Sequence, residues 1–381
     1  MEWKEVRLGD FMQCNPKRTI KKGQMARKIT MDLLIPHSKA IRNWNYEQYS
    51  GGAKFQNGDT IMARITPCLE NGKHAFVSIL NEGEIAYGST EYFVFCGMAD
   101  VSDNDFVYYL TKTPLFRDTA IKSMVGSSGR QRAQMDVLEN LKMFVPKEIS
   151  DQRRIASLLS SLDRKIELNN KINARLEEMA QAIFKNWFVD FEPFKDGKFK
   201  ESELGRIPEG WKVGCLGDIA EITSGKRPPK KSKDKTKELF IPLIGASDIM
   251  GFTSDVLYER PILVIGRVGT HGVVQRFQEK CWPSDNTLVI ESSYYNYVYQ
   301  LLKRIDYSAI NRGSTQPLIT QTDVKSTNVI IAPEYILKGY ESITSTLFRK
   351  FSVNITESSR LASLRDTLLP RLMSGEIEVP E

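Results

Sequence analysis

The feature that most constrains the fold of this chain is an internal repeat. Trp3-Lys4 followed by Leu8-Gly9-Asp10 returns later as Trp211-Lys212 followed by Leu216-Gly217-Asp218. The ends of the two halves also correspond: Asp136-Val137 and Val145-Pro146 match Asp323-Val324 and Ala332-Pro333, and Ser160, Leu162, Arg164, Lys165, Asn169, Arg175 and Leu176 match Ser345, Leu347, Arg349, Lys350, Asn354, Arg360 and Leu361. A solenoid repeats every 20 to 50 residues or so, which is much shorter than the separation between Trp3 and Trp211. The repeated unit is therefore a whole domain with its connector, duplicated once.

The composition is that of a folded protein with more than one domain. A chain of 381 residues has room for two or three domains, and its 41% apolar and 26% charged residues exclude a disordered protein. The net charge of +6 is compatible with a nucleic-acid partner. No apolar run approaches the roughly 18 to 20 residues that cross a bilayer, and residues 1–20 lack a secretory core. We therefore expect a cytoplasmic protein without membrane contact.

Two segments have the pattern of mixed globular domains. Residues 1–147 and 211–333 alternate short β-rich runs with turns such as Asn57-Gly58 and Asn71-Gly72. Strands are predicted at 59–63, 75–79, 91–95, 239–244, 262–265, 272–276 and 287–290, and a helix at 104–122. Residues 193–210, rich in Pro and Gly, are predicted to be a linker between the second domain and the helix that precedes it.

Each globular segment is followed by a long helical segment, at 148–192 and at 334–381. From residue 151 to 190 no Gly or Pro occurs, and apolar residues recur every three or four positions. Ser150 is the predicted N-cap of the first helix. In the second, Pro370 is predicted to bend the last turn or to separate a short final helix, and Gly375 to end it. A helix of about 40 residues would span about 60 Å and needs another long helix beside it. The expected fold is α+β: two globular mixed α/β domains separated by two long antiparallel helices that form a coiled coil, with a pseudo-two-fold internal repeat.

Both predicted helices carry an asparagine within the apolar stripe. Asn169 follows Leu162, and Asn354 follows Leu347, at corresponding places of the repeat. A polar residue in a coiled-coil seam costs stability but fixes register. The two asparagines are therefore candidates for setting the helix register, and the alternative is that each faces solvent or a loop.

The motifs of common catalytic and cofactor sites do not occur. The chain has no G-x-x-x-x-G-K-[ST], no H-E-x-x-H among its three histidines, no G-x-S-x-G, and no C-x-x-C among its five cysteines. Gly266 to Gly272 is glycine-rich, but it lacks the dinucleotide-binding spacing. It is interpreted as a tight turn between strands or as backbone that approaches a phosphate. We expect no catalytic residue, no cofactor and no metal.

Basic residues are the remaining signals. The segment 226–237 contains Lys226, Arg227, Lys230, Lys231, Lys233, Lys235 and Lys237 against Asp234 alone, which is typical of a phosphate-neutralising loop or of a merely solvated one. Two turns, 126–132 and 311–316, combine small residues with Arg and Gln, which read base edges or hold phosphates, unless they are structural turns. The candidate DNA-binding residues are Arg64, Lys73, Arg130, Gln131, Arg132, Lys226, Arg227, Lys230, Lys231, Arg267, Thr270, Arg312 and Gln316.

The helical segments resemble those of a known family. Asp151-Gln152-Arg153-Arg154-Ile155, Leu162-Asp163-Arg164-Lys165-Ile166-Glu167-Leu168-Asn169-Asn170 and Phe184-Lys185-Asn186-Trp187-Phe188-Val189-Asp190-Phe191 resemble the central conserved region of the specificity (S) subunits of type I restriction–modification systems. Leu364-Arg365-Asp366-Thr367-Leu368-Leu369-Pro370-Arg371-Leu372-Met373-Ser374-Gly375-Glu376 resembles the C-terminal end of these subunits. The resemblance runs the length of the chain, although no counterpart of Asp-Gln-Arg-Arg follows Pro333.

The resemblance implies a non-catalytic DNA-recognition subunit. Residues 1–147 and 211–333 would be target recognition domains that each read one half of a split site, and the helices would set the gap between the halves. The implied partners are double-stranded DNA, two adenine-N6 methyltransferase (M) subunits and, in the full complex, restriction (R) subunits. Because the helices repeat closely and the globular segments do not, we expect an asymmetric bipartite target. The competing hypotheses are a coiled-coil protein-interaction scaffold with incidental DNA contact, and an enzyme.

Overall fold

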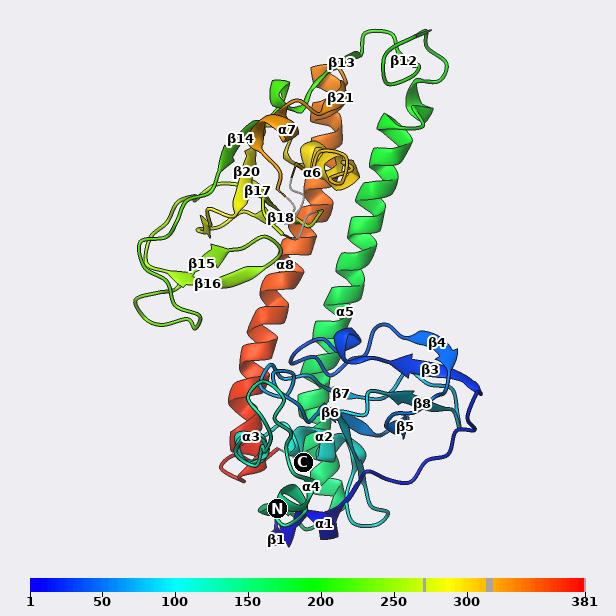
Figure 1. Cartoon of the computed structure of the whole chain (residues 1–381), viewed down its shortest axis with the longest axis vertical. Coiled ribbons are helices and arrows are strands. Elements are labelled where there is room, and N and C mark those ends of the chain that lie inside the picture. Colours follow the sequence, from blue (N-terminus) through cyan, green and yellow to red (C-terminus); the bar gives the residue numbers. More distant parts are fainter. Residues whose placement is uncertain (270–271, 313–317, 380–381) are drawn as a thin grey trace. The chain divides into compact units, whose positions relative to one another are not determined.

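The computed structural model describes residues 1–269, 272–312 and 318–379, and these residues form two compact units (Figure 1). Unit 1 contains residues 1–171 and 353–381, and unit 2 contains residues 172–352. Each unit therefore takes one globular part and a portion of both long helices. No helix in the described ranges is long and apolar enough to cross a membrane.

The globular part of unit 1, from β1 to β10, is called head 1 below. Its strands are β1 (Trp3–Arg7), β2 (Met12–Cys14), β3 (Met25–Ile29), β4 (Asn45–Gln48), β5 (Lys54–Gln56), β6 (Thr60–Ala63), β7 (His74–Phe76), β8 (Ile85–Gly88), β9 (Tyr92–Gly97) and β10 (Lys142–Pro146). Its helices are α1 (Leu8–Phe11), η1 (Met31–Leu33), α2 (Asn104–Leu110), α3 (Pro114–Lys122) and α4 (Met135–Glu139).

The globular part of unit 2, from β13 to β21, is called head 2. Its strands are β13 (Lys212–Cys215), β14 (Glu221–Ser224), β15 (Ile241–Ile244), β16 (Ile249–Thr253), β17 (Ile262–Gly266), β18 (Val274–Phe277), β19 (Trp282–Pro283), β20 (Thr287–Glu291) and β21 (Asn328–Ile331). Its helices are η3 (Leu216–Asp218), α6 (Tyr295–Arg304) and α7 (Gln321–Lys325). The long helices are α5 (Ile149–Phe188) and α8 (Glu334–Met373), and η2 (Glu192–Phe194), β11 (Phe199–Lys200) and β12 (Ile207–Pro208) connect α5 to head 2.

The two heads share one sheet topology apart from β5, which pairs with β8 in head 1 and has no counterpart among the described strands of head 2. Sheet β2-β9-β6-β7 of head 1 has the strand order of sheet β14-β20-β17-β18 of head 2, and the pair β1-β10 corresponds to β13-β21. In the remaining sheets, β3 pairs antiparallel with β4 and parallel with β8, as β15 does with β16 and β19. The duplication seen in the sequence at the ends of the two halves therefore extends through the heads, where few residue identities remain.

The repeated Leu-Gly-Asp sequence packs against the last short helix of each head, which is α4 in head 1 and α7 in head 2. Leu8 and Leu216 are fully buried, and their N–H groups donate to the carbonyls of Leu141 and Thr327 at 3.0 and 2.9 Å. A Cβ atom on Gly9 would lie 3.3 Å from Glu139 of α4, and one on Gly217 would lie 3.4 Å from Lys325 of α7. The signature is therefore a packing motif.

The strand pairing corrects one detail of the repeat by a single residue. Lys4 pairs with Val145, whereas Lys212 pairs with Ile331, so Val145 corresponds to Ile331 and not to Ala332. Similarly, the buried Leu138 of α4 corresponds to the buried Val324 of α7. The Leu138 carbonyl accepts from Leu141 N–H just after α4, and the Val324 carbonyl accepts from Thr327 N–H just after α7. The matches of Asp136-Val137 and Val145-Pro146 are thus wrong by one position, since residue identity there did not follow the hydrogen bonds.

The predicted helix at 104–122 is two helices. Thr113 caps α3, with its side chain accepting from Phe116 N–H, and Pro114 takes the first helical position, where its missing N–H costs nothing. Both long helices are present, but Ser150 is not the cap. The helix begins at Ile149, and the carbonyl of Glu148 accepts the first bonds from the N–H groups of Asp151 and Gln152. No short final helix is separated, because α8 continues through Pro370 to Met373. Gly375, with φ of +75°, follows its end as predicted.

The long helices run antiparallel within each unit. In unit 1, Asp163 of α5 contacts Arg365 of α8, and further along α5 the Asn169 amide contacts the Asn354 carbonyl at 3.5 Å. In unit 2, the Asn173 amide donates to the Phe351 carbonyl at 3.2 Å, and further along α5 the Ala180 carbonyl accepts from the Tyr340 hydroxyl at 3.3 Å. Residue numbers on one helix rise as those on the other fall, which confirms the predicted pairing direction.

A buried histidine in head 1 predicts acid sensitivity of unit 1. His74 stacks on Tyr108 with ring centroids 4.7 Å apart, and burial, with Lys112 and Arg117 next, lowers its pKa from 6.5 to about 3. Between these pH values the unfolded chain binds a proton that the folded chain does not. The free energy of unfolding of unit 1 should therefore fall with falling pH by at most about 1.4 kcal/mol per pH unit from this group.

The measurement is urea denaturation at several pH values between 4 and 7 or so, with His74→Phe as the comparison. The variant keeps a ring against Tyr108 and removes the titrating group, so its stability should depend less on pH than that of the natural chain. Equal pH dependence of the two proteins would show that His74 binds its proton equally well in the folded and unfolded states.

Candidate nucleic-acid interface

Arg64 and Arg267 occupy equivalent places in the two heads. Each directly follows the inner strand of its sheet, β6 or β17. Arg64 N–H donates to the Glu91 carbonyl and Arg267 N–H to the Asn286 carbonyl, both at 2.9 Å. The carbonyls of the two arginines accept from the N–H groups of Ala133, which directly follows the predicted turn at 126–132, and of Ile319, which comes three residues after the predicted turn at 311–316. In head 1 the structure therefore brings the arginine and its turn together. In head 2 Arg267 lies beside the chain that follows the turn, of which residues 313–316 are outside the described residues.

In head 1 a carboxylate organises this cluster. Glu91 accepts hydrogen bonds from the Arg132 guanidinium at 2.8 Å and from Arg64 Nε at 3.2 Å. The bonds from Arg132, and then those from Arg64, hold the pKa of Glu91 below its usual value. A shared carboxylate fixes both guanidinium groups in direction while leaving them partly exposed, with 35% and 40% of the two side chains accessible. Such fixed donors suit bidentate contact with a base edge or a phosphate.

Head 2 builds the same place differently. Asn286 stands where head 1 has Glu91, and the buried Nε of Arg267 has no hydrogen-bond partner among the described residues. Arg312 instead pairs with Asp323 of α7, leaving 64% of the arginine side chain exposed. Thr270 and Gln316 lie outside the described residues.

The other predicted residues of head 1 differ in exposure. Arg130 is exposed in the turn, and Gln131 contributes its carbonyl to Thr66 N–H at 3.0 Å. Lys73 is half-buried, and its ammonium donates to the Met31 carbonyl at 2.6 Å, so it is the least available of the set.

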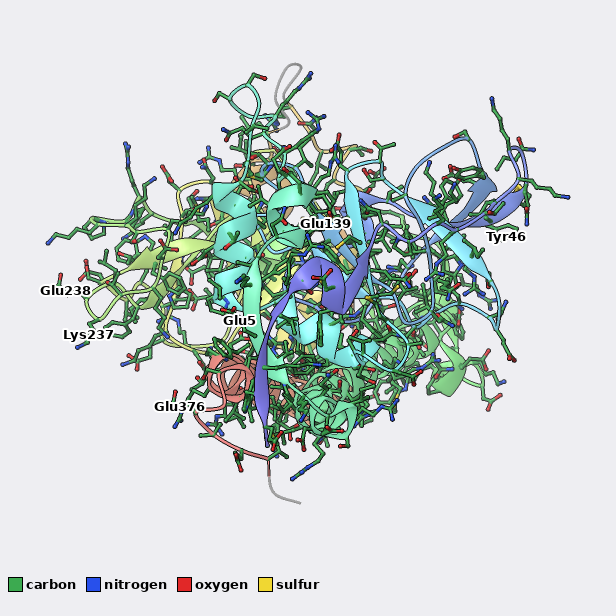
Figure 2. All side chains as sticks on the ribbon, turned by 90° about the horizontal axis from the view of Figure 1, so that it is seen from below. Glu5, Tyr46, Glu139, Lys237, Glu238 and Glu376 are labelled. Atoms are coloured by element: carbon green, nitrogen blue, oxygen red, sulfur yellow. The ribbon has the colours of Figure 1, made fainter. Side chains whose placement is uncertain are left out.

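The basic segment 226–237 forms the loop between β14 and β15. Lys226, Arg227, Lys230 and Lys231 are all exposed. In Figure 2 the labelled side chains of Lys237 and Glu238, at the end of this loop, project away from the ribbon. Closely spaced exposed basic groups attract phosphates, and neutralising a phosphate would release the cations condensed on the nucleic acid. The exposure of these residues is therefore compatible with the predicted phosphate-neutralising loop.

Sequence reasoning missed the counterpart of this loop in head 1. Because β2 and β3 correspond to β14 and β15, the segment between them, residues 15–24, corresponds to the basic loop. It carries Lys17, Lys21 and Lys22, all exposed, together with Arg18, which is bound to the buried Asp59 at 2.7 Å. The signal was present as a run of basic residues without an acidic one, but only the topology relates the two segments.

Asn169 and Asn354, the predicted register residues, meet in unit 1. Both are fully buried, and the Asn169 amide also donates to the Glu357 carboxylate at 2.8 Å and to Ser358 at 3.3 Å. Neither asparagine faces solvent or a loop, so the alternative placement is wrong. Their role in fixing register stays a prediction.

The Asp-Gln-Arg-Arg motif serves contacts within unit 1. Gln152 is fully buried; it accepts from Asp103 N–H at 3.0 Å and donates to the carbonyls of Val101 and Pro146. Arg154 donates to the Val379 carbonyl at 2.6 Å. In unit 2 a different residue holds the head to a long helix: Glu341 of α8 accepts from Tyr297 N–H at 2.8 Å. The contacts between head and long helix thus differ between the two units, in keeping with the absence of the motif after Pro333.

The described residues contain no cluster of His, Cys, Asp or Glu that could hold a metal ion. The basic loops and the arginines after β6 and β17 carry positive charge, which is suited to a polyanion such as nucleic acid.

Comparisons with known proteins agree with this chemistry. The family model of the type I restriction modification DNA specificity domain matches residues 1–178 and again residues 208–358. The chain is 31% identical over 306 residues to the type I restriction enzyme MjaIX specificity subunit of Methanocaldococcus jannaschii, covering 73% of this chain and 70% of that one. It is 24% identical over 469 aligned positions to the HindI specificity subunit of Haemophilus influenzae, covering 99% and 100%.

A solved structure shares the fold. The crystal structure of the S subunit of a type I restriction–modification system from M. genitalium superposes with a TM-score of 0.56 at 15% identity, covering 98% of this chain and 96% of the other.

Proposed function

Because the chain belongs to the type I restriction–modification DNA specificity family, whose model matches it twice, we propose that its two heads read two different halves of one split DNA target. The observation that carries this proposal is a shared sheet topology with unlike reading residues. Glu91 holds two arginines in head 1, whereas Asn286 stands in its place in head 2. A common scaffold approaches DNA in a common way, and different donors at its tip favour different bases.

Within each head the two kinds of basic site have different tasks. The loops at 15–24 and 225–240 would neutralise phosphates, which positions the head without reading sequence. The arginines after β6 and β17, with their turns, would contact base edges. Arg64, Arg132, Arg267 and Arg312 are therefore the proposed specificity residues.

The long helices would provide the frame for partner subunits. Their sequences repeat far more closely than those of the heads, and like surfaces suit like partners. We propose that two methyltransferase subunits dock on them, and that restriction subunits join this complex. The helices would also set the distance between the half-sites, with Asn169 and Asn354 fixing their register. As the specificity subunit, the chain supplies recognition, and the chemistry belongs to the other subunits.

The inferred location is the cytoplasm. The relatives come from archaea and bacteria, whose DNA lies there.

The test is to co-express the chain with its methyltransferase subunit and map methylated adenines in the DNA of the host. We expect one asymmetric bipartite motif with a fixed gap. A palindromic motif would contradict unlike heads, and DNA binding that is insensitive to salt and to sequence would favour the protein-interaction scaffold.

Single arginine variants should separate the half-sites. Arg64→Ala should relax base preference in one half-site and Arg267→Ala in the other, each by about 1–3 kcal/mol at one position. Methylation of DNA libraries randomised in each half measures this. Arg206→Ala, which changes an exposed arginine in the segment between α5 and head 2, is the control and should leave both preferences unchanged. Loss of preference in the same half with both variants would contradict the assignment.

A further inference from the structure

Lys39 of head 1 lies where this head packs against the long helix α5. The Lys39 ammonium bonds to Asp105 of α2 and donates to Ser160 Oγ of α5 at 2.7 Å. It also lies 4.7 to 5.0 Å from the ring centroids of Phe76, Tyr108 and Tyr109. One cation thus touches the head, its helix α2 and the long helix together.

Head 2 inserts an arginine at its own meeting place with α8. Arg276 of β18 donates to the Asn296 side-chain oxygen of α6 at 2.8 Å, and the Asn296 amide donates to Ser345 Oγ of α8 at 3.4 Å. The guanidinium lies 3.6 Å from the ring centroid of Phe348, also on α8, and 4.6 Å from that of Tyr299.

The partners of the two cations correspond position by position. The helices α2 and α6 begin with the same bond, from Val107 to Asp103 and from Val298 to Tyr294. This equates Asp105 with Asn296 and Tyr108 with Tyr299. Ser160 and Ser345 are partners in the helix repeat. Each cation therefore meets an acid or amide and a tyrosine in equivalent positions. Lys39 reaches the helix serine directly, whereas Arg276 reaches it through the Asn296 amide.

The cations themselves come from different backbone positions. Thr60 pairs with Phe76, and Leu263 pairs with Arg276, so Arg276 stands where head 1 has Phe76. Lys39 reaches the same place from a neighbouring segment, since its carbonyl accepts from Phe76 N–H at 3.0 Å. The two heads thus have a positive charge at the same place, although different residues, Lys39 and Arg276, supply it.

Burying a cation is costly unless paired groups compensate for the lost water, and apolar side chains would fill the same space at less cost. Only 14% of the Lys39 side chain is exposed. What a charged group adds over an apolar one is direction, because its hydrogen bonds hold it to particular partners. Lys39 bonds directly to both head 1 and α5, and Arg276 bonds to Asn296 of head 2 while its guanidinium lies against the Phe348 ring of α8, so each cation holds its head against a long helix.

We propose that Lys39 and Arg276 are positioning residues that fix how each head is held on the long helices, and that they thereby set which half-site spacing the protein accepts. The inference rests on the proposed bipartite function. It concerns spacing, and the arginine turns retain the choice of bases. A misplacement of about 1 Å at a reacting group can cost about a hundredfold in rate. A head held firmly on the helices would therefore lose much of the methylation rate on DNA with a wrong gap, and a loosened head would lose less.

The experiment uses the complete complex with its methyltransferase subunits. Methylation rates are measured on DNA carrying the mapped target, and on DNA whose gap is one base pair longer or shorter. Lys39→Met and Arg276→Met should keep the base preference in both half-sites and lower the discrimination between correct and altered gaps by about tenfold or more. Lys39→Arg and Arg276→Lys should recover most of it.

The control is Lys28→Met, which removes a half-buried lysine whose partner, Glu47, lies within head 1. It should leave gap discrimination unchanged. Ser345→Ala, which removes a single hydroxyl, is a milder second variant of the head 2 junction and should shift discrimination in the same direction. Unchanged gap discrimination in folded Lys39→Met, Arg276→Met and Ser345→Ala complexes overturns the inference. A natural complex without a gapped target would instead overturn the proposed function.

Discussion

Replacing Arg365 by methionine is expected to lower the free energy of unfolding of unit 1 by about 3–5 kcal/mol, the range for breaking a buried ion pair. Arg365 of α8 and Asp163 of α5 form such a pair, with 5% and 7% of their side chains exposed. Asp163 also accepts from the Tyr109 hydroxyl at 2.6 Å. Without the guanidinium, the carboxylate would stay buried, and the neutral Tyr109 hydroxyl would be its one side-chain donor among the described residues.

This pair has a structural role beyond charge balance. It joins the two long helices, and the Tyr109 hydroxyl attaches α2 of head 1 to the same carboxylate. Burial, and then the Asp163 charge, raises the pKa of the Tyr109 phenol, which favours the protonated form that donates to the carboxylate. The loss should therefore loosen head 1 and both helices together.

Urea denaturation followed by circular dichroism measures the loss, and hydrogen exchange of residues 149–171 locates it. The control is Arg175→Met, because the pair Arg175–Glu178 is 79% and 60% exposed and should contribute about 1 kcal/mol or less. Changing Asp163→Leu and Arg365→Met together should restore part of the stability, since no charge is then left alone. If Arg365→Met alone were as stable as Arg175→Met, this would show that water reaches the Asp163 carboxylate, contrary to the prediction.

The second large effect is expected from the basic loop of head 2. Changing Lys226, Arg227, Lys230 and Lys231 to alanine should weaken binding to all DNA sequences alike. If each contacts a phosphate, the slope of log K against log salt should become less steep by up to about 3.6, because about 0.9 counterion is released per contact. Fluorescence anisotropy with labelled duplexes at several salt concentrations measures the slope.

A matched control removes the same charge elsewhere. Lys195, Lys198, Lys200 and Lys212 are exposed and lie outside both loops, so their replacement by alanine should change the slope little. Changing Lys17, Lys21 and Lys22 tests the corresponding loop of head 1, with an expected change of up to about 2.7. Altered base preference with an unchanged slope would mean that these loops read bases.

How much could be predicted from the sequence differs between helices and heads. The helices α5 and α8 follow from apolar periodicity, which is a local property of the chain. Tertiary contacts decided the details. Pro370 remains inside α8, and the helix at 104–122 breaks at Thr113, which caps the helix that follows. Candidate residues were chosen by type, so exposed Arg130 and half-buried Lys73 looked alike until the structure placed them.

The sequence by itself determined the duplication, the two long helices, the asparagines in their seam and the basic loop after β14, because each depends on residues close together in the chain. Only the tertiary structure decided that both heads have one topology, that Arg64 corresponds to Arg267, and that Lys39 and Arg276 occupy the same place. These relations depend on strand pairing between distant segments. Hydrogen bonds between backbones preserve such pairing while side chains change, so the fold keeps a correspondence that residue identity has lost.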